Sequence, residues 1–90
     1  MPFTFEFNEE KNQLLKETRG VNFNDIINAL EKGNFLADLV HHSQSRKNQR
    51  ILVVKIKRYV YAVPYLQKTR RTLFLKTVYP SRILTRKYLK

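Results

Sequence analysis

Residues 50–66, RILVVKIKRYVYAVPYL, decide the fold that this sequence predicts. Residues 50–57 carry apolar side chains at both even and odd positions, which predicts a strand with apolar groups on both of its faces. The polar pair Lys57-Arg58 separates this strand from a second one over residues 59–66, so the two should form an antiparallel hairpin with a tight turn. Pro64 has no backbone N–H, and we therefore expect it at a sheet edge or a strand end.

The N-terminal third predicts one strand and two helices. Residues 2–7 place three phenylalanines at every second position, which predicts a strand with one buried face. Asn8 and Asn22 are favourable N-cap residues, and the apolar positions after Asn22 have the spacing of an amphipathic helix. We expect helices over residues 9–19 and 23–32, each ended by a glycine.

The C-terminal part predicts further strands and one more helix. Residues 35–40 and 72–79 have the composition of strands, whereas residues 41–49 are polar and turn-like. Pro80 ends the last of these strands, and residues 82–90 predict a short C-terminal helix or tail. Consecutive strands joined by short polar turns predict an antiparallel meander with the helices segregated to one side.

These elements follow the order β-α-α-β-β-β-β-α in a single domain, residues 1–90. Ninety residues support one hydrophobic core and no second domain. The fold class that we expect is α+β: an antiparallel sheet of four to five strands, two N-terminal helices packed on one side of it, and a short C-terminal helix.

The distribution of charge indicates the kind of partner. The chain has 18 Lys and Arg against 7 Asp and Glu, a formal net charge of +11. Residues 1–33 hold four bases and six acids, whereas residues 34–90 hold fourteen bases and a single acid, Asp38. So basic a segment repels itself and needs a polyanion or an acidic protein as its partner, and nucleic acid is the commonest polyanion of a cytoplasm.

The sequence excludes several classes of site. It contains no cysteine, which excludes a disulfide framework, a thiolate metal site and a cysteine nucleophile. His41 and His42 have only Asp38 as a nearby carboxylate, so we expect no metal, and with two glycines in the chain we expect no phosphate-cradling loop or cofactor. No apolar run approaches the ~20 residues of a bilayer span, and no leader-like block opens the chain, so we expect a cytoplasmic protein without a membrane partner.

Basic and aromatic residues are interleaved through the second half of the chain. The set comprises Lys55, Lys57, Arg58, Tyr59, Tyr61, Tyr65, Arg70, Arg71, Lys76, Tyr79, Arg82, Arg86 and Tyr88. Such a surface suits RNA, because lysine and arginine neutralise phosphates while tyrosine rings and arginine planes stack on unpaired bases. The simpler interpretation is a solvated basic face whose tyrosines pack with their edges outward.

Both ends of the chain carry short motifs that resemble those of a known family. They are FNEEKN at residues 7–12, RGVNF at 19–23, LKT at 75–77, PSR at 80–82 and TRKY at 85–88. In this order they resemble the opening and closing segments of BrnT-type toxins, which belong to the RelE-like superfamily. The sequence departs from the family pattern in having Arg-Gly where a His-Gly commonly precedes the second helix.

The resemblance implies a RelE-like fold and a ribonuclease toxin of a type II toxin–antitoxin pair. It also implies a ribbon-helix-helix antitoxin as partner, with DNA contacted only through that antitoxin. By matching position, it implies functional roles for Lys76, Ser81, Arg82 and Tyr88, with His42 as a looser match. Ser81 is expected among the residues that contact RNA.

We therefore expect an endoribonuclease that cleaves mRNA, on or off the ribosome, by metal-independent attack of a ribose 2′-hydroxyl. Arg82 would stabilise the charge on phosphorus, Lys76 would hold the phosphate, and His42 or Tyr88 would exchange protons. A turn after Pro80 is expected to aim Arg82 towards Lys76. The residues expected to position the RNA are Lys55, Lys57, Arg58, Arg70, Arg71 and Arg86.

Two other functions remain open at this point. One is a non-catalytic RNA- or DNA-binding module, which needs the same basic surface but no proton-transfer groups. The other is a basic interaction protein that docks an acidic partner and does not bind nucleic acid.

Overall fold

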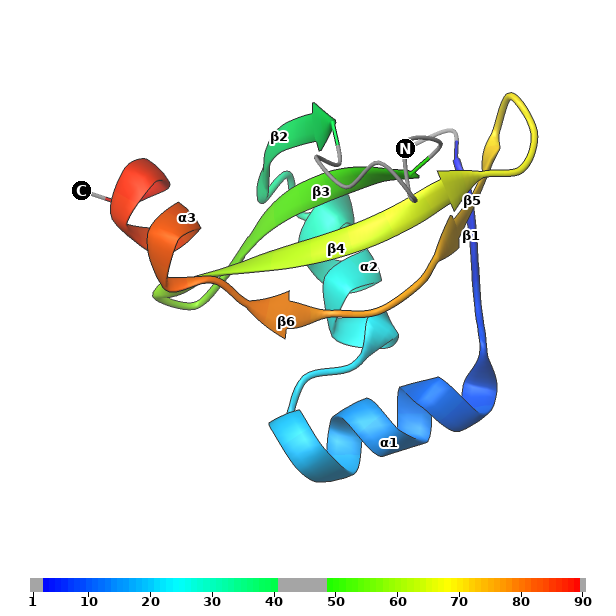
Figure 1. Cartoon of the computed structure of the whole chain (residues 1–90), viewed down its shortest axis with the longest axis horizontal. Helices are drawn as coiled ribbons and strands as arrows, with labels where there is room; N and C mark the ends of the chain where they lie inside the picture. The colour runs from blue at the N-terminus through cyan, green and yellow to red at the C-terminus, as the bar shows by residue number, and fades with distance from the viewer. Residues whose placement is uncertain (1–2, 41–48, 90) are drawn as a thin grey trace.

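A mixed six-stranded sheet with three helices makes up the described part of the chain, residues 3–40 and 49–89, in a computed structural model (Figure 1). The fold class is α+β, as the sequence predicts. The elements are β1 (Thr4–Phe7), α1 (Glu9–Arg19), α2 (Phe23–Glu31), β2 (Phe35–Val40), β3 (Gln49–Ile56), β4 (Tyr59–Gln67), β5 (Thr72–Leu75), β6 (Tyr79–Pro80) and α3 (Arg82–Tyr88).

The strands lie in the order β1-β5-β4-β3-β2, and β6 pairs with β4. Strands β2 to β5 form the antiparallel meander that the sequence predicts, and Ile56 faces Tyr59 across the two-residue turn between β3 and β4. The sheet is mixed, however, because β1 pairs in parallel with β5. The helices α1 and α2 follow β1 and return the chain to the sheet at the opposite edge, so β1 finds its neighbour in a strand from the other end of the sequence.

Pro64 lies in a central strand, so the prediction of an edge or end position is wrong. Its carbonyl accepts a hydrogen bond from the amide of Lys76 at 2.8 Å, which shows that the missing Pro64 N–H would face the same neighbour. That neighbour is interrupted here: β5 ends at Leu75 and β6 begins at Tyr79. The strand predicted over residues 72–79 is therefore split, because Pro64 offers no donor to it.

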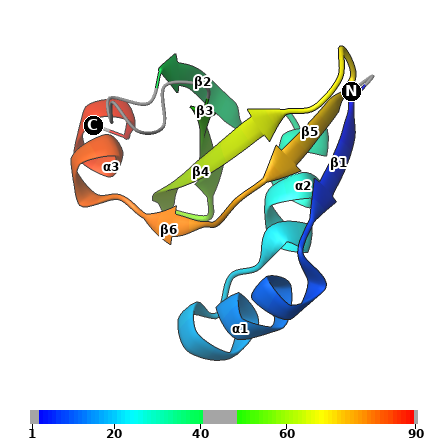
Figure 2. The same cartoon turned by 45° about the vertical axis from the view of Figure 1, so that its right-hand side comes forward.

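The core lies between α2 and one face of the sheet. Phe23, Ile26 and Leu30 of α2 are buried at the amphipathic spacing, and they belong to one cluster with inward side chains of β3, β4 and β5. Leu15 of α1 joins the same cluster, whereas Leu14 is half exposed. In Figures 1 and 2, α2 crosses the back of the sheet and α1 lies below it.

Helix α3 is attached to β4 mainly through backbone and hydroxyl groups. The amide of Ser81 donates to the Val60 carbonyl at 3.0 Å, and the Val60 amide donates to the Thr85 hydroxyl at 3.0 Å. No residue of α3 is fully buried, and Ile83 is 78% exposed. These two contacts hold the Ser81–Thr85 side of α3 against β4 and leave Ile83 in solvent.

Asn12 joins the two N-terminal helices. Its side chain is 3% exposed, and its Oδ1 accepts a hydrogen bond from the amide of Phe23 at 2.8 Å. Phe23 is the first residue of α2, whose N-terminal amides have no partner within the helix. Asn22 and Asp25 form a capping box that satisfies the amides of both residues. The N-terminal half of α1, where Asn12 lies, is thus held at a fixed position relative to the start of α2.

We predict that Asn12→Ala lowers the free energy of unfolding by about 1–3 kcal/mol, because the buried Phe23 amide loses its acceptor. Asn24→Ala is the matched control, since Asn24 is an exposed asparagine in the first turn of α2 and its replacement should change stability by no more than about 0.5 kcal/mol. Urea denaturation of both variants measures the difference, and equal losses would contradict this role of Asn12.

Candidate functional site

A cleft with a volume of about 710 Å³ lies between α2 and the β3–β4 hairpin. Its size is in the range of pockets that hold small ligands. Five cations from three segments of the chain line it: Arg19, Lys32, and Lys55, Lys57 and Arg58 of the hairpin. Asp25 is the only carboxylate of the lining, and Tyr59 and Tyr61 provide aromatic rings. We call this feature the hairpin cleft.

Local sequence signals place several of these side chains. Arg19 ends α1 just before Gly20, which adopts the left-handed conformation at φ 69°, and Lys32 caps the C-terminus of α2. Helix C-termini favour cations, which accounts for both positions. Lys57 is the first residue of the hairpin turn and has φ 58°, so a lysine occupies a position where glycine is usual.

Arg19 is anchored across the fold. Its guanidinium donates a hydrogen bond to the backbone carbonyl of Val78, in the segment between β5 and β6. This carbonyl lies in the interruption that faces Pro64. The contact fixes one N–H of the guanidinium and leaves the others to bind a ligand at the wall of the hairpin cleft.

The positive charge of the hairpin cleft is not neutralised within the described residues. In residues 3–40 and 49–89, the two ion pairs are Arg50–Asp38 and Lys68–Glu6, and neither involves a cation of the cleft. The carboxylate of Asp25 accepts the Asn22 amide at 3.0 Å as part of the capping box. Five clustered cations against one lining carboxylate raise the local concentration of anions, so the cleft can bind a polyanion.

Tyr59 and Tyr61 project from the same face of β4. Their rings meet edge to face, with centroids 5.9 Å apart and planes at 65°. Both side chains are partly exposed, and both line the hairpin cleft next to its cations. The combination of phosphate-binding cations and ring faces is the one that single-stranded RNA requires.

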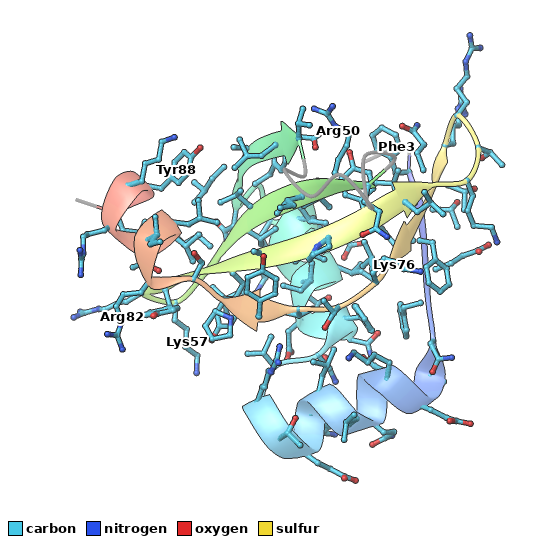
Figure 3. The ribbon with its side chains drawn as sticks, viewed as in Figure 1. Phe3, Arg50, Lys57, Lys76, Arg82 and Tyr88 are labelled. Atoms are coloured by element: carbon cyan, nitrogen blue, oxygen red, sulfur yellow. The ribbon has the colours of Figure 1, made fainter. Side chains whose placement is uncertain are left out.

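The residues expected from the family pattern are not gathered in one place. Figure 3 shows Arg82 at the same end of the molecule as Lys57, whereas Lys76 lies towards the other end. Lys76 faces a groove beside α1, with its Nζ 5.4 Å from the centroid of Phe74. The expectation that Arg82 points at Lys76 is therefore wrong, because the break opposite Pro64 and the short β6 carry the chain away before α3 begins.

The other predicted residues are spread over α3 and the opposite turn. The Ser81 hydroxyl caps α3 by accepting the Leu84 amide at 3.1 Å. Tyr88 ends α3, with the Lys87 Nζ 5.6 Å from its ring centroid. Arg86 is exposed on the same helix.

Arg70 and Arg71 are exposed in the turn between β4 and β5, far from the hairpin. The predicted proton-transfer residue His42 lies outside the described residues. Of the predicted RNA contacts, the structure thus brings Lys55, Lys57 and Arg58 together in the cleft, with Arg82 at the same end of the sheet.

The sequence analysis misses Arg19 and Lys32 as candidates. Both belong to residues 1–33, where acids outnumber bases, so the segment gave no indication of a basic site. The available signal was local: each of these cations ends a helix and immediately precedes a glycine that turns the chain.

Tyr65 is unavailable for stacking, although the sequence places it with the RNA-binding aromatics. It is 4% exposed, and its hydroxyl donates to Asp38 Oδ2 at 2.9 Å. Arg50 donates from Nε to Asp38 Oδ1 at 3.0 Å, which completes a cluster across β2, β3 and β4. Burial, and then the hydrogen bond to the Asp38 carboxylate, raise the pKa of Tyr65 to about 12.

This shift predicts a loss of stability at alkaline pH. The pKa of Tyr65 is higher in the folded chain than in the unfolded chain, where it is 10.0, so its contribution is complete below about pH 10 and is lost as the pH rises towards about 12. Between these values, urea unfolding of Tyr65→Phe should depend less on pH than that of the wild type. The exposed Tyr79 serves as control, and Tyr79→Phe should keep the wild-type dependence. Identical pH profiles for all three proteins would contradict the role of Tyr65.

The comparisons identify no relative. No protein-family model matches the chain, and no curated protein or solved structure matches it either. None of the helices in the described ranges is both long and apolar enough to cross a lipid bilayer. Among the same residues, no three side chains of the metal-binding types come together. The function must therefore be inferred from the chemistry of the hairpin cleft and α3.

Proposed function

We propose that this protein is a ribonuclease toxin of a type II toxin–antitoxin system, which binds single-stranded RNA at the hairpin end of its sheet. The observation that carries the proposal is the hairpin cleft itself: five cations from three segments converge there with no ion-pair partner among the described residues. The family resemblance of the N- and C-terminal motifs supports the toxin assignment.

RNA matches the chemistry of this end of the molecule. Phosphates neutralise the lysines and arginines, and binding releases the counterions that a bare polyanion holds. Unpaired bases can stack on tyrosine rings, which proteins use to hold single strands without reading their sequence. A small anion would satisfy the charge but would leave the ring faces of Tyr59 and Tyr61 unused.

Cleavage would proceed by intramolecular transfer at one phosphate. A base removes the proton of the ribose 2′-hydroxyl, the resulting oxygen attacks the adjacent phosphorus, and the bond to the 5′-oxygen breaks as that oxygen takes up a proton. The products are a 2′,3′-cyclic phosphate and a free 5′-hydroxyl. Arg82 stabilises the added charge on phosphorus with its planar set of donors, and Tyr88 or His42 exchanges the protons.

Lys57 and Arg58 take the phosphate-holding role that the sequence analysis assigns to Lys76. They lie at the same end of the sheet as Arg82, whereas Lys76 faces the groove beside α1. Arg86, on the same helix as Arg82, extends the basic surface along the RNA. In this arrangement the hairpin positions the RNA strand, which is cleaved beside α3.

The natural inhibitor would be a ribbon-helix-helix antitoxin that presents acidic groups to the hairpin cleft. Burial of several cations without partners costs several kcal/mol for each ion, so an inhibitor that covers this cleft must neutralise them. DNA would be contacted only through the antitoxin.

A non-catalytic RNA-binding module is the second candidate, and one observation favours it. Among the described residues, the hairpin cleft contains no histidine, and the carboxylate of Asp25 is engaged in the capping box. A binding module needs neither group. Cleavage assays on the pure protein separate the two functions.

The first prediction of this proposal concerns the salt dependence of RNA binding. If about five phosphates of a single strand are contacted, log K should fall with log salt at a slope near −3.5, and Lys57→Ala should make this slope shallower by about 0.7. Lys16→Ala is the matched control, because Lys16 is an exposed lysine of α1 that does not line the cleft. A flat response of the wild type to salt would exclude RNA as the ligand.

The second prediction separates catalysis from binding. Arg82→Ala should lower the single-turnover cleavage rate by about 10²–10³-fold, which is typical for the loss of one donor to a developing oxyanion. RNA affinity should fall only by the share of one phosphate contact, and stability should change by no more than about 0.5 kcal/mol because Arg82 is exposed. Lys16→Ala, an exposed position on α1 outside the cleft, should cleave normally. An Arg82→Ala variant that cleaves at the wild-type rate would remove Arg82 from the mechanism.

A further inference from the structure

We propose that the hairpin cleft is a subsite for one unpaired nucleotide, whose base stacks on Tyr59 and whose phosphate lies against Lys57 and Arg58. This inference rests on the proposed binding of RNA, and it names the part of the strand that the cleft recognises. The subsite would make the protein select single-stranded over paired RNA, independently of where cleavage occurs.

The two tyrosines differ in how firmly the fold holds them. Tyr61 packs against the hydrophobic core, whereas Tyr59 is not part of that packing. Tyr59 instead directly follows the hairpin turn and meets Tyr61 edge to face. Tyr61 therefore acts as the support that orients the ring of Tyr59, and Tyr59 is the ring that remains able to stack on a base.

The cations beside Tyr59 lie at the right place for a backbone phosphate. Lys57 and Arg58 immediately precede Tyr59 in the chain, and both line the same cleft. On the facing wall, Arg19 is held by its hydrogen bond to the Val78 carbonyl. A nucleotide in the cleft can stack its base on Tyr59 while its phosphate contacts the cations. A free phosphate ion would use only the cations.

The cleft also has polar groups that can contact the edge of a base. Asn28 and Asn34 line it. An amide offers both a donor and an acceptor, which suits the Watson–Crick edge of an unpaired base. In a duplex that edge is occupied and the base faces are stacked, so the subsite favours single strands.

Binding of a short oligoadenylate tests the subsite. Tyr59→Ala should lower the affinity for the oligonucleotide by between about fivefold and about a hundredfold, which is the range for loss of one base–aromatic stack. Tyr59→Phe should bind it as tightly as the wild type. Tyr79→Ala is the control, since Tyr79 is exposed and lies outside the cleft. Unfolding midpoints in urea verify that each variant is folded.

A strand of abasic sites with the same number of phosphates isolates the contribution of the base. The wild type should bind it more weakly than the oligoadenylate, and Tyr59→Ala should bind both strands equally.

Binding of adenosine 5′-monophosphate tests whether the ligand of the cleft is RNA or a free nucleotide. RNA also contacts the cations outside the subsite, whereas the monophosphate cannot. The oligoadenylate should therefore bind much more tightly than the monophosphate.

The failure of this inference can be distinguished from failure of the proposed function. If Tyr59→Ala binds the oligoadenylate like the wild type while Lys57→Ala still lowers the salt slope, RNA binds this surface but not through a stacked base, and the subsite is wrong. If the monophosphate binds as tightly as the oligoadenylate, the assignment of the subsite to RNA is wrong. If the wild type binds neither strand at low salt, the proposed function itself fails.

Discussion

The absence of a backbone donor at Pro64 is the constraint on which much of the C-terminal half depends. β4 runs through the middle of the sheet, and at Pro64 it has no N–H to donate to the strand beside it, although the Pro64 carbonyl still accepts from the Lys76 amide. The neighbouring strand β5 therefore stops at Leu75, the chain keeps one hydrogen bond to β4 through the Lys76 amide, and pairing resumes as β6 opposite Tyr61 and Ala62. The side chain of Val78 enters the core within this break, while its carbonyl is left to accept from Arg19.

The same interruption decides which basic residues meet. β6 pairs with Tyr61 and Ala62, close to the N-terminal end of β4. Helix α3 therefore begins beside Val60 and the hairpin turn, and Arg82 lies at the end of the molecule where Lys57 lies (Figure 3). Lys76 stays in the break and faces α1. A continuous strand would place Lys76 and Pro80 on one face of a regular ladder, as the alternation of side chains predicts. The split sheet instead assembles a basic end from the two N-terminal helices, the hairpin and α3.

Within the described residues, the cations of the hairpin cleft form no ion pairs. Asp25 is engaged in the capping box, and the two ion pairs of the described residues, Arg50–Asp38 and Lys68–Glu6, involve no cation of the cleft. The cations of the cleft repel one another, and this repulsion is relieved only by an anionic partner. If RNA or an acidic inhibitor binds the folded state more tightly than the unfolded chain, its binding should raise the stability of the protein.

Local features of the sequence determined most of the secondary structure and part of the site. Asn8 and Asn22 cap their helices, Gly20 ends α1, the turn falls at Lys57-Arg58, and Ser81 caps α3, because each of these depends on neighbours a few residues away. For the same reason, the interleaving of basic and aromatic residues around the turn predicted Lys55, Lys57 and Arg58 as members of one basic surface.

Only the tertiary structure decided the features that depend on residues far apart in the chain. Periodicity does not show which strand becomes central, so it could not place Pro64 in the middle of the sheet or β1 in parallel beside β5. Nor could net charge by segment show that Arg19 and Lys32 face the hairpin, or that Asp38 holds the hydroxyl of a buried Tyr65. These arrangements are fixed by strand register and by the packing of helices on the sheet, and both are properties of the whole chain.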